Sequence, residues 1–116
     1  MKIQIIFITL QQKIGNNIFI NMKLKDVCIF STEFPDADFW LIREGSADKV
    51  GKPVKKYDKD YIGVKVTRTD LLLPDYLYYV FEYLNSQKLL AQLAKGTTDK
   101  KHISISDIKE IPIGRT

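Results

Sequence analysis

The stretch "YIGVKVTRTDLLLPDYLYYVFEYLNSQKLLAQLAKG", residues 61–96, passes from one residue periodicity to another. In its first part Ile62, Val64 and Val66 alternate with other residues, which places them on one face of an extended chain. Lys65 falls on the opposite face. This alternation predicts a half-buried strand.

A helical pattern follows the strand. Pro74 occupies the place of a first helical residue, and Asp75 follows in the first turn, where a negative charge is favourable. The apolar residues that come next recur at i, i+3, i+4 and i+7, which predicts one buried helix face. These residues are Leu77, Val80, Phe81 and Leu84.

The helical pattern is interrupted once and then resumes. Asn85 and Ser86 predict a break or a kink. The apolar repeat continues as far as Leu93, and Gly96 is a typical helix terminator. The stretch therefore predicts two helices or one bent helix.

Two shorter elements are predicted upstream. The segment "MKLKDVCIF", residues 22–30, has Leu24, Val27 and Cys28 at helical spacing, which predicts a single helical turn. After turn-forming residues, "FWLIRE" at residues 39–44 has the apolar character of a buried strand. The polar residues that follow, interrupted by Gly and Pro, predict a long loop or an exposed hairpin.

The segment "KGTTDKKHISISDIKEIPIG" follows the helices. His102 and Ile103 predict a short strand, whereas Ser104 with Asp107 fits the capping pattern of a short helix over residues 105–110. Pro112 ends this helix, and "IPI" at residues 111–113 can pair as a closing strand. The element order predicts an α+β fold, with a small mixed sheet and a helical hairpin or bent helix late in the chain.

The length of 116 residues fits one domain. Residues 1–21 read as an N-terminal extension outside the native domain, which we expect to span residues 22–116. The apolar run near the start is too short for a membrane span and has no small-residue cleavage site. With a single cysteine and no disulfide, we expect a cytoplasmic protein without membrane contact.

Catalytic and metal-binding patterns are weak. Cys28 and His102 could pair as nucleophile and base, but Cys28 stands in an apolar segment typical of an inert cysteine. Asp75 and Asp99, followed by Lys100, superficially resemble a nuclease pattern of carboxylates and lysine around a divalent cation. In that pattern both carboxylates come from adjoining strands, whereas Asp75 is expected at a helix start and Asp99 in a loop. We expect no catalytic residue, no metal ligand and no cofactor.

The positive charge lies in the predicted loops. Residues 43–68 hold eight Lys and Arg against four acidic residues, and residues 95–101 hold three lysines against Asp99. Lysine- and threonine-rich loops suit contacts to DNA phosphates. Solvated loops without a partner are the alternative. The tyrosines at helical spacing could stack on bases, but a packing face is the favoured interpretation. They are Tyr76, Tyr79 and Tyr83.

The order of three segments resembles the target recognition domain of type I restriction–modification specificity subunits. They are "MKLKDVCIF", "DYLYYVFEYLNSQ" and "GTTDKKHISISDIKEIPI". The closing motif of that family is matched by Gly96, Thr97, Thr98, His102, Ile103, Ser104, Asp107, Ile108, Lys109, Ile111 and Ile113. The resemblance implies an α+β domain that reads a duplex half-site in the major groove through loops. Methyltransferase and nuclease subunits would carry the chemistry, and the histidine-bearing turn would shape the domain.

The chain departs from the family in carrying one recognition domain and no long connecting helices. A phage or mobile-element relative, or a half-subunit that forms a homodimer, fits this pattern. Double-stranded DNA is the expected partner, with a DNA methyltransferase subunit as a further one. The alternative is a protein-interaction module that engages a methyltransferase or interferes with restriction. The predicted DNA-binding residues are Lys52, Lys55, Lys56, Lys59, Arg68, Thr97, Thr98, Lys100 and Lys101.

Overall fold

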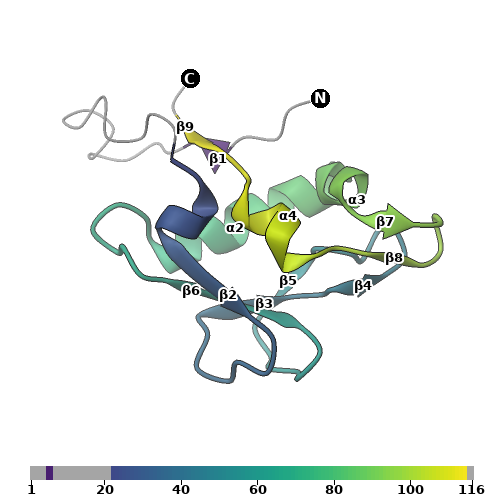
Figure 1. Ribbon diagram of the computed structural model, residues 1–116, viewed down its shortest axis with the longest axis horizontal. Coiled ribbons are helices and arrows are strands. Elements are labelled where there is room, and N and C mark those ends of the chain that lie inside the picture. Colours follow the sequence, from purple (N-terminus) through teal and green to yellow (C-terminus); the bar gives the residue numbers. More distant parts are fainter. Residues whose placement is uncertain (1–4, 7–21, 115–116) are drawn as a thin grey trace.

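The computed structural model describes residues 5–6 and 22–114. Their elements in chain order are β1 (Ile5–Ile6), η1 (Leu24–Asp26), β2 (Cys28–Ser31), β3 (Phe39–Leu41), β4 (Glu44–Gly45), β5 (Pro53–Val54), β6 (Ile62–Val66), α2 (Pro74–Ser86), α3 (Leu89–Leu93), β7 (Lys95–Gly96), β8 (Lys101–His102), α4 (Ile105–Lys109) and β9 (Ile113–Gly114). The fold class is α+β, with the helices late in the chain, as predicted (Figure 1).

The largest sheet has four antiparallel strands in the order β2-β6-β3-β5. Helix α2 packs against this sheet. The ring centroids of Phe81 on α2 and Phe39 on β3 are 6.1 Å apart. Tyr78 also contacts Phe39, with ring centroids 5.4 Å apart. The predicted strand at residues 62–66 is confirmed, since Ile62, Val64 and Val66 are all buried. It lies inside the sheet, where both of its edges are paired.

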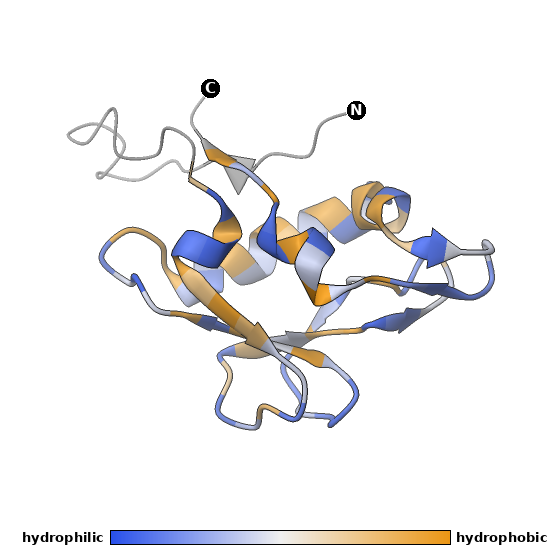
Figure 2. Ribbon diagram, in the orientation of Figure 1, coloured by the Kyte–Doolittle hydropathy of each residue, from blue (hydrophilic) through white to orange (hydrophobic). Residues whose placement is uncertain are grey.

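A second antiparallel sheet of three short strands has the order β4-β8-β7. Strands β1 and β9 form a separate parallel pair. The sequence predicts one small mixed sheet. In the structure each of the two larger sheets is antiparallel, and the parallel pair β1-β9 is separate from them. Figure 2 shows hydrophobic residues along β2 and on parts of α2 and α3, and hydrophilic residues at β7.

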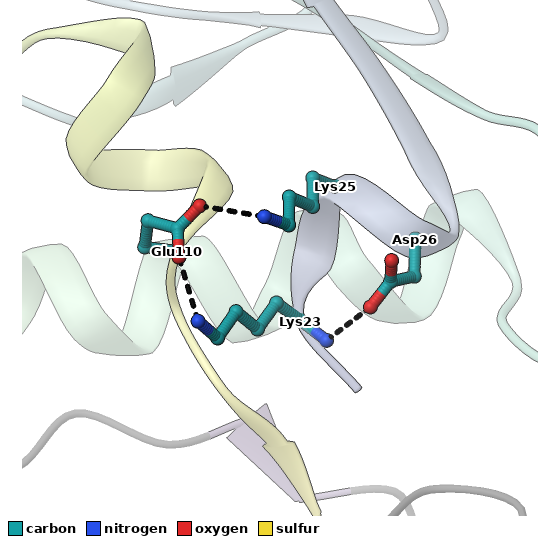
Figure 3. Close-up of polar contacts among 4 residues, drawn as sticks. All are labelled: Lys23, Lys25, Asp26 and Glu110. Atoms are coloured by element: carbon teal, nitrogen blue, oxygen red, sulfur yellow. Dashed lines mark hydrogen bonds and ion pairs between the residues drawn. The ribbon is translucent and has the colours of Figure 1, made fainter. Parts of the chain in front are cut away.

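The first and last parts of the domain are joined side by side. Leu24 N donates to Ile111 O at 3.0 Å, and Ile113 N donates to Met22 O at 2.9 Å. Glu110 accepts from two lysines, with Lys23 Nζ 2.7 Å from Oε1 and Lys25 Nζ 3.1 Å from Oε2 (Figure 3). Hydrogen bonds from these lysines lower the pKa of the Glu110 carboxyl. The expected extension at residues 1–21 falls mostly outside the described residues, and its boundary stays a prediction.

The helices begin and end much as the sequence predicts. Pro74 is the first residue of α2, and its buried face is formed by Leu77, Phe81 and Leu84. The predicted break is a full interruption, because Lys88 adopts a left-handed backbone with φ of 57° between α2 and α3. The interpretation as two helices is therefore correct.

The single helical turn predicted in residues 22–30 is present as η1, but it ends at Asp26, and Cys28 begins strand β2. One local prediction is wrong. Gly96 does not terminate a helix, because α3 already ends at Leu93 and Gly96 belongs to β7 with φ of +114°. Residues 45–60 also contain β5 at Pro53–Val54, which joins the large sheet.

The predicted cap of the last helix is present. Ser104 has an extended backbone, and its Oγ accepts a hydrogen bond from Asp107 N at 3.2 Å. Replacing Ser104 by Ala should lower the free energy of unfolding by about 1 kcal/mol, because a backbone N–H loses its partner. Urea unfolding measures this change. Lys109→Ala, at an exposed position of the same helix, is the control, and an equal loss in both variants would contradict a capping role for Ser104.

None of the helices in the described residues is long and apolar enough to cross a membrane.

Candidate nucleic-acid interface

The loop between β5 and β6, residues 55–61, is held by hydrogen bonds within the loop and by hydrogen bonds from neighbouring segments. Within it, Asp60 N donates to Asp58 Oδ1 at 2.8 Å, and Tyr61 N donates to Asp58 O at 3.1 Å. From outside, Glu33 N donates to Lys59 O at 3.1 Å and Arg43 Nε donates to Asp60 O at 3.1 Å. The loop backbone is therefore fixed against two neighbouring segments.

Four of the predicted DNA-binding lysines lie in or next to this loop. They are Lys52, Lys55, Lys56 and Lys59, and all are exposed. Within residues 22–114, no acidic side chain forms an ion pair with any of them. The ammonium of Lys55 lies 4.8 Å from the centre of the Tyr78 ring, a cation–π contact that limits its freedom. The loop thus offers three exposed lysines that form no ion pair within residues 22–114, beside the two carboxylates of Asp58 and Asp60.

Tyr57 lies in the middle of these lysines, and the sequence prediction did not select it. Its ring is 6.0 Å from that of Trp40 at an interplanar angle of 66°, yet 40% of the residue remains exposed. Trp40 is 7% exposed, and its Nε1 donates to Phe34 O at 2.9 Å. The segment "KKYDK", residues 55–59, was the available signal, because it places one aromatic residue close to three lysines.

The second group of predicted residues lies in the turn between β7 and β8. Thr97, Thr98 and Lys100 are exposed there, whereas Lys101 is half-buried. Lys100 N donates to Thr97 O at 3.2 Å, which closes the turn. Thr98 O accepts from Ala47 N at 3.0 Å, which attaches the turn to the segment after β4.

Arg68 stands apart from both groups. It lies in the segment between β6 and α2, where its Nε and Nη2 donate to the two carboxylate oxygens of Asp70 at 3.0 and 2.8 Å. These hydrogen bonds raise the pKa of Arg68 and lower that of Asp70. Because this guanidinium already has a carboxylate partner, it is the least suited of the nine residues to hold a phosphate.

The nine predicted residues therefore divide among three surface regions. Figure 1 shows the β6–α2 segment and the β7–β8 turn toward opposite ends of the horizontal axis, with the β5–β6 loop below the sheet. The two lysine-rich loops are hydrophilic in Figure 2. The geometry favours the β5–β6 loop as the centre of a contact surface, with the β7–β8 turn as a second one.

A polar cavity of about 370 Å³ lies beside the β5–β6 loop. It is lined by Arg43, Glu44, Asp58, Asp60 and Tyr61. Because three of these five side chains are acidic, the cavity is poorly suited to hold a phosphate group. The lysines on the loop itself are the better candidates.

The residues considered for catalysis lie on different secondary-structure elements. Cys28 is 5% exposed on β2, and burial, followed by the charge of Asp38, raises the pKa of its thiol to about 12. Its thiol is therefore protonated at neutral pH, whereas His102 is exposed on β8. Asp75 lies in the first turn of α2 and Asp99 in the β7–β8 turn. In the described part of the chain, no three His, Cys, Asp or Glu side chains could hold a metal ion together.

The sequence favours a packing face for the tyrosines of α2, and the exposure of these side chains tests that interpretation. Tyr79 and Tyr83 are 62% and 61% exposed, so that interpretation is wrong for both. Tyr76 is half-buried. The periodicity of the tyrosines marks a flank of α2 next to its buried face, which the spacing alone did not distinguish from the core.

Comparison of the chain with protein-family models, with curated proteins and with solved structures found no match.

Proposed function

We propose that this chain is a DNA-binding domain of the target-recognition type, which contacts a duplex half-site through its loops and has no catalysis of its own. It would serve a type I restriction–modification-like system in the cytoplasm. The proposal rests on the motif order in the sequence together with the arrangement of the lysine-rich loops.

The observation that carries the proposal is the β5–β6 loop. Its backbone is fixed by hydrogen bonds to Glu33 and Arg43, while its lysines are exposed and form no ion pair with the acidic residues of the described part of the chain. A surface lysine without a carboxylate partner can neutralise a DNA phosphate and release its counterion. A fixed backbone reduces the conformational entropy that binding would otherwise remove. The β7–β8 turn adds threonine hydroxyls and further lysines that suit the same role.

Replacing Lys55 and Lys56 together by Ala should weaken binding to all duplexes, because each lysine is expected to contact a phosphate. The slope of log K against log salt concentration should fall by about two, one for each lost contact. Fluorescence anisotropy with a labelled duplex at several salt concentrations measures both quantities.

The matched control is the double variant Lys23→Ala and Lys25→Ala, which removes the same charge. These lysines are already paired with Glu110. We expect the control to keep the salt slope of the original chain. If the Lys55 and Lys56 variant also keeps its affinity and slope, or if both variants lose equally, the loop is not the contact surface.

Base reading is a separate part of the proposal. Selection of random duplexes by the purified protein, repeated at two salt concentrations, tests it. A recognition domain should enrich one half-site sequence at both concentrations, because base contacts persist when phosphate contacts weaken. Binding that vanishes with modest salt and enriches nothing would reduce the activity to non-specific contact.

A protein-interaction module is the second candidate, and the exposed tyrosines of α2 favour it. Tyr79 and Tyr83 lie one helical turn apart and are largely exposed, as is Leu73 before the helix. Aromatic residues are enriched at protein interfaces. A methyltransferase subunit would be the partner. Its capture by this chain, lost in the Tyr79→Ala and Tyr83→Ala double variant and independent of DNA, would favour this function.

A further inference from the structure

We propose that Tyr57 is a stacking residue that contacts a nucleobase displaced from the helical stack of bound DNA. This inference rests on the proposed function and adds a specific kind of substrate, a duplex with an unstacked base. The base would lie against the tyrosine ring while neighbouring lysines hold the backbone on either side.

The packing of Tyr57 is the first support. The ring centroids of Trp40 and Tyr57 are 6.0 Å apart. Trp40 is itself fixed by the hydrogen bond from its Nε1 to Phe34 O. The ring of Tyr57 is therefore supported on one side, while 40% of the residue stays exposed. A supported, partly exposed aromatic ring loses little side-chain entropy on stacking, so more of the stacking energy remains as affinity.

The charge around Tyr57 is the second support. Lys55, Lys56 and Lys59 flank it in sequence, all exposed and without ion-pair partners in the described residues, and they outnumber the two acidic residues of the loop, Asp58 and Asp60, which line the neighbouring cavity. Proteins that hold unpaired bases combine such a positive strip with aromatic side chains. Every base has an apolar face, so this contact would add affinity without requiring a particular sequence.

The other exposed tyrosines lack this combination. Tyr79 and Tyr83 lie on α2, where Asp75 and Glu82 are the charged residues and no lysine or arginine occurs between Pro74 and Ser86. Tyr79 has its own partner in Tyr78, with ring centroids 5.6 Å apart. Among the tyrosines more than one-third exposed in residues 22–114, Tyr57 alone has lysines adjacent in sequence.

The test compares two duplexes of equal length, one fully paired and one with a single bulged adenine. Fluorescence anisotropy measures the affinity of the full chain for each. We expect about tenfold tighter binding to the bulged duplex, from the stacking of one base. Tyr57→Phe should keep this ratio, and Tyr57→Ala should reduce it to about one. Replacing the bulged base by 2-aminopurine gives a direct signal, because stacking quenches its fluorescence.

Tyr57→Leu guards against a folding effect, since leucine can still pack against Trp40 but cannot stack as an aromatic ring. It should melt at a temperature close to that of the original chain and still lose the preference. If the original chain binds both duplexes equally, or if Tyr57→Leu and Tyr57→Ala retain the preference, this inference is wrong and the proposed function stands. If the original chain binds neither duplex, both are wrong.

Discussion

Replacing Phe81 by Ala should lower the free energy of unfolding by about 3–5 kcal/mol, the range measured for large buried aromatic residues. Phe81 is fully buried, and it connects α2 to the large sheet through Phe39. Its removal takes away both the transferred apolar surface and the contact between these two layers. A domain of this size has a total stability of about 5–15 kcal/mol, so a large part of it would be lost. Urea unfolding followed by circular dichroism measures the change.

Tyr83→Ala is the matched control on the same helix, because Tyr83 is 61% exposed and lies outside the core. We expect its stability to change by no more than about 0.5 kcal/mol. If Tyr83→Ala is as destabilising as Phe81→Ala, the exposed flank of α2 is covered in solution. A loss of less than about 1 kcal/mol for Phe81→Ala would contradict the packing of α2 on the sheet.

Gly51→Ala should lower the free energy of unfolding by about 2–5 kcal/mol, from two causes that act together. Gly51 has φ of +81°, where residues with a side chain are strained. An added Cβ would also lie 2.6 Å from Cδ1 and 2.8 Å from Cβ of Leu90, which is fully buried on α3. The glycine is held in place, since its N–H donates to Ile42 O at 2.7 Å. Thermal and urea unfolding both measure the loss.

A double-mutant cycle with Leu90→Ala measures how much of this loss comes from the far end of the Leu90 side chain. Leu90→Ala removes the Cδ1 that would lie 2.6 Å from the new Cβ, but it leaves the Leu90 Cβ at 2.8 Å and the backbone strain at Gly51. We expect the double variant to lose at least about 1 kcal/mol less stability than the two single variants lose in sum. Strict additivity would mean that the Leu90 Cδ1 adds nothing to the loss.

The central elements of the fold were predictable because their signals are local. Alternation places Ile62, Val64 and Val66 in a strand, and Pro74 marks the first residue of α2. The capping pattern at Ser104 likewise depends on residues three positions apart. Each of these signals lies within one element, where spacing and backbone geometry are directly related.

The errors arise where one pattern fits two structures. The spacing of Leu24, Val27 and Cys28 correctly predicts the turn η1, but a short apolar run also fits a strand, and pairing with β6 places Cys28 in β2. Gly96 was read as a helix terminator because such glycines adopt positive φ. A tight hairpin has the same requirement, and Gly96 meets it within β7.

The candidate site was only partly predictable for a similar reason. Composition marks its lysines as exposed, but the support of Tyr57 by Trp40 joins positions far apart in the sequence. The hydrogen bond from Glu33 to Lys59 depends in the same way on how the sheet brings two loops together. The pairing of Arg68 with Asp70 is local, and the two-residue spacing could have suggested it.

The pairing of residues 22–24 with residues 111–113 has a topological consequence. Met22 and Leu24 share hydrogen bonds with Ile113 and Ile111, so the backbone at these two positions of the chain lies about one strand spacing apart. A unit bounded by residues 22 and 113 could be spliced into a surface loop of another protein without stretching the host. It could also be circularly permuted, with a short peptide closing these two positions and new ends opened in an exposed turn.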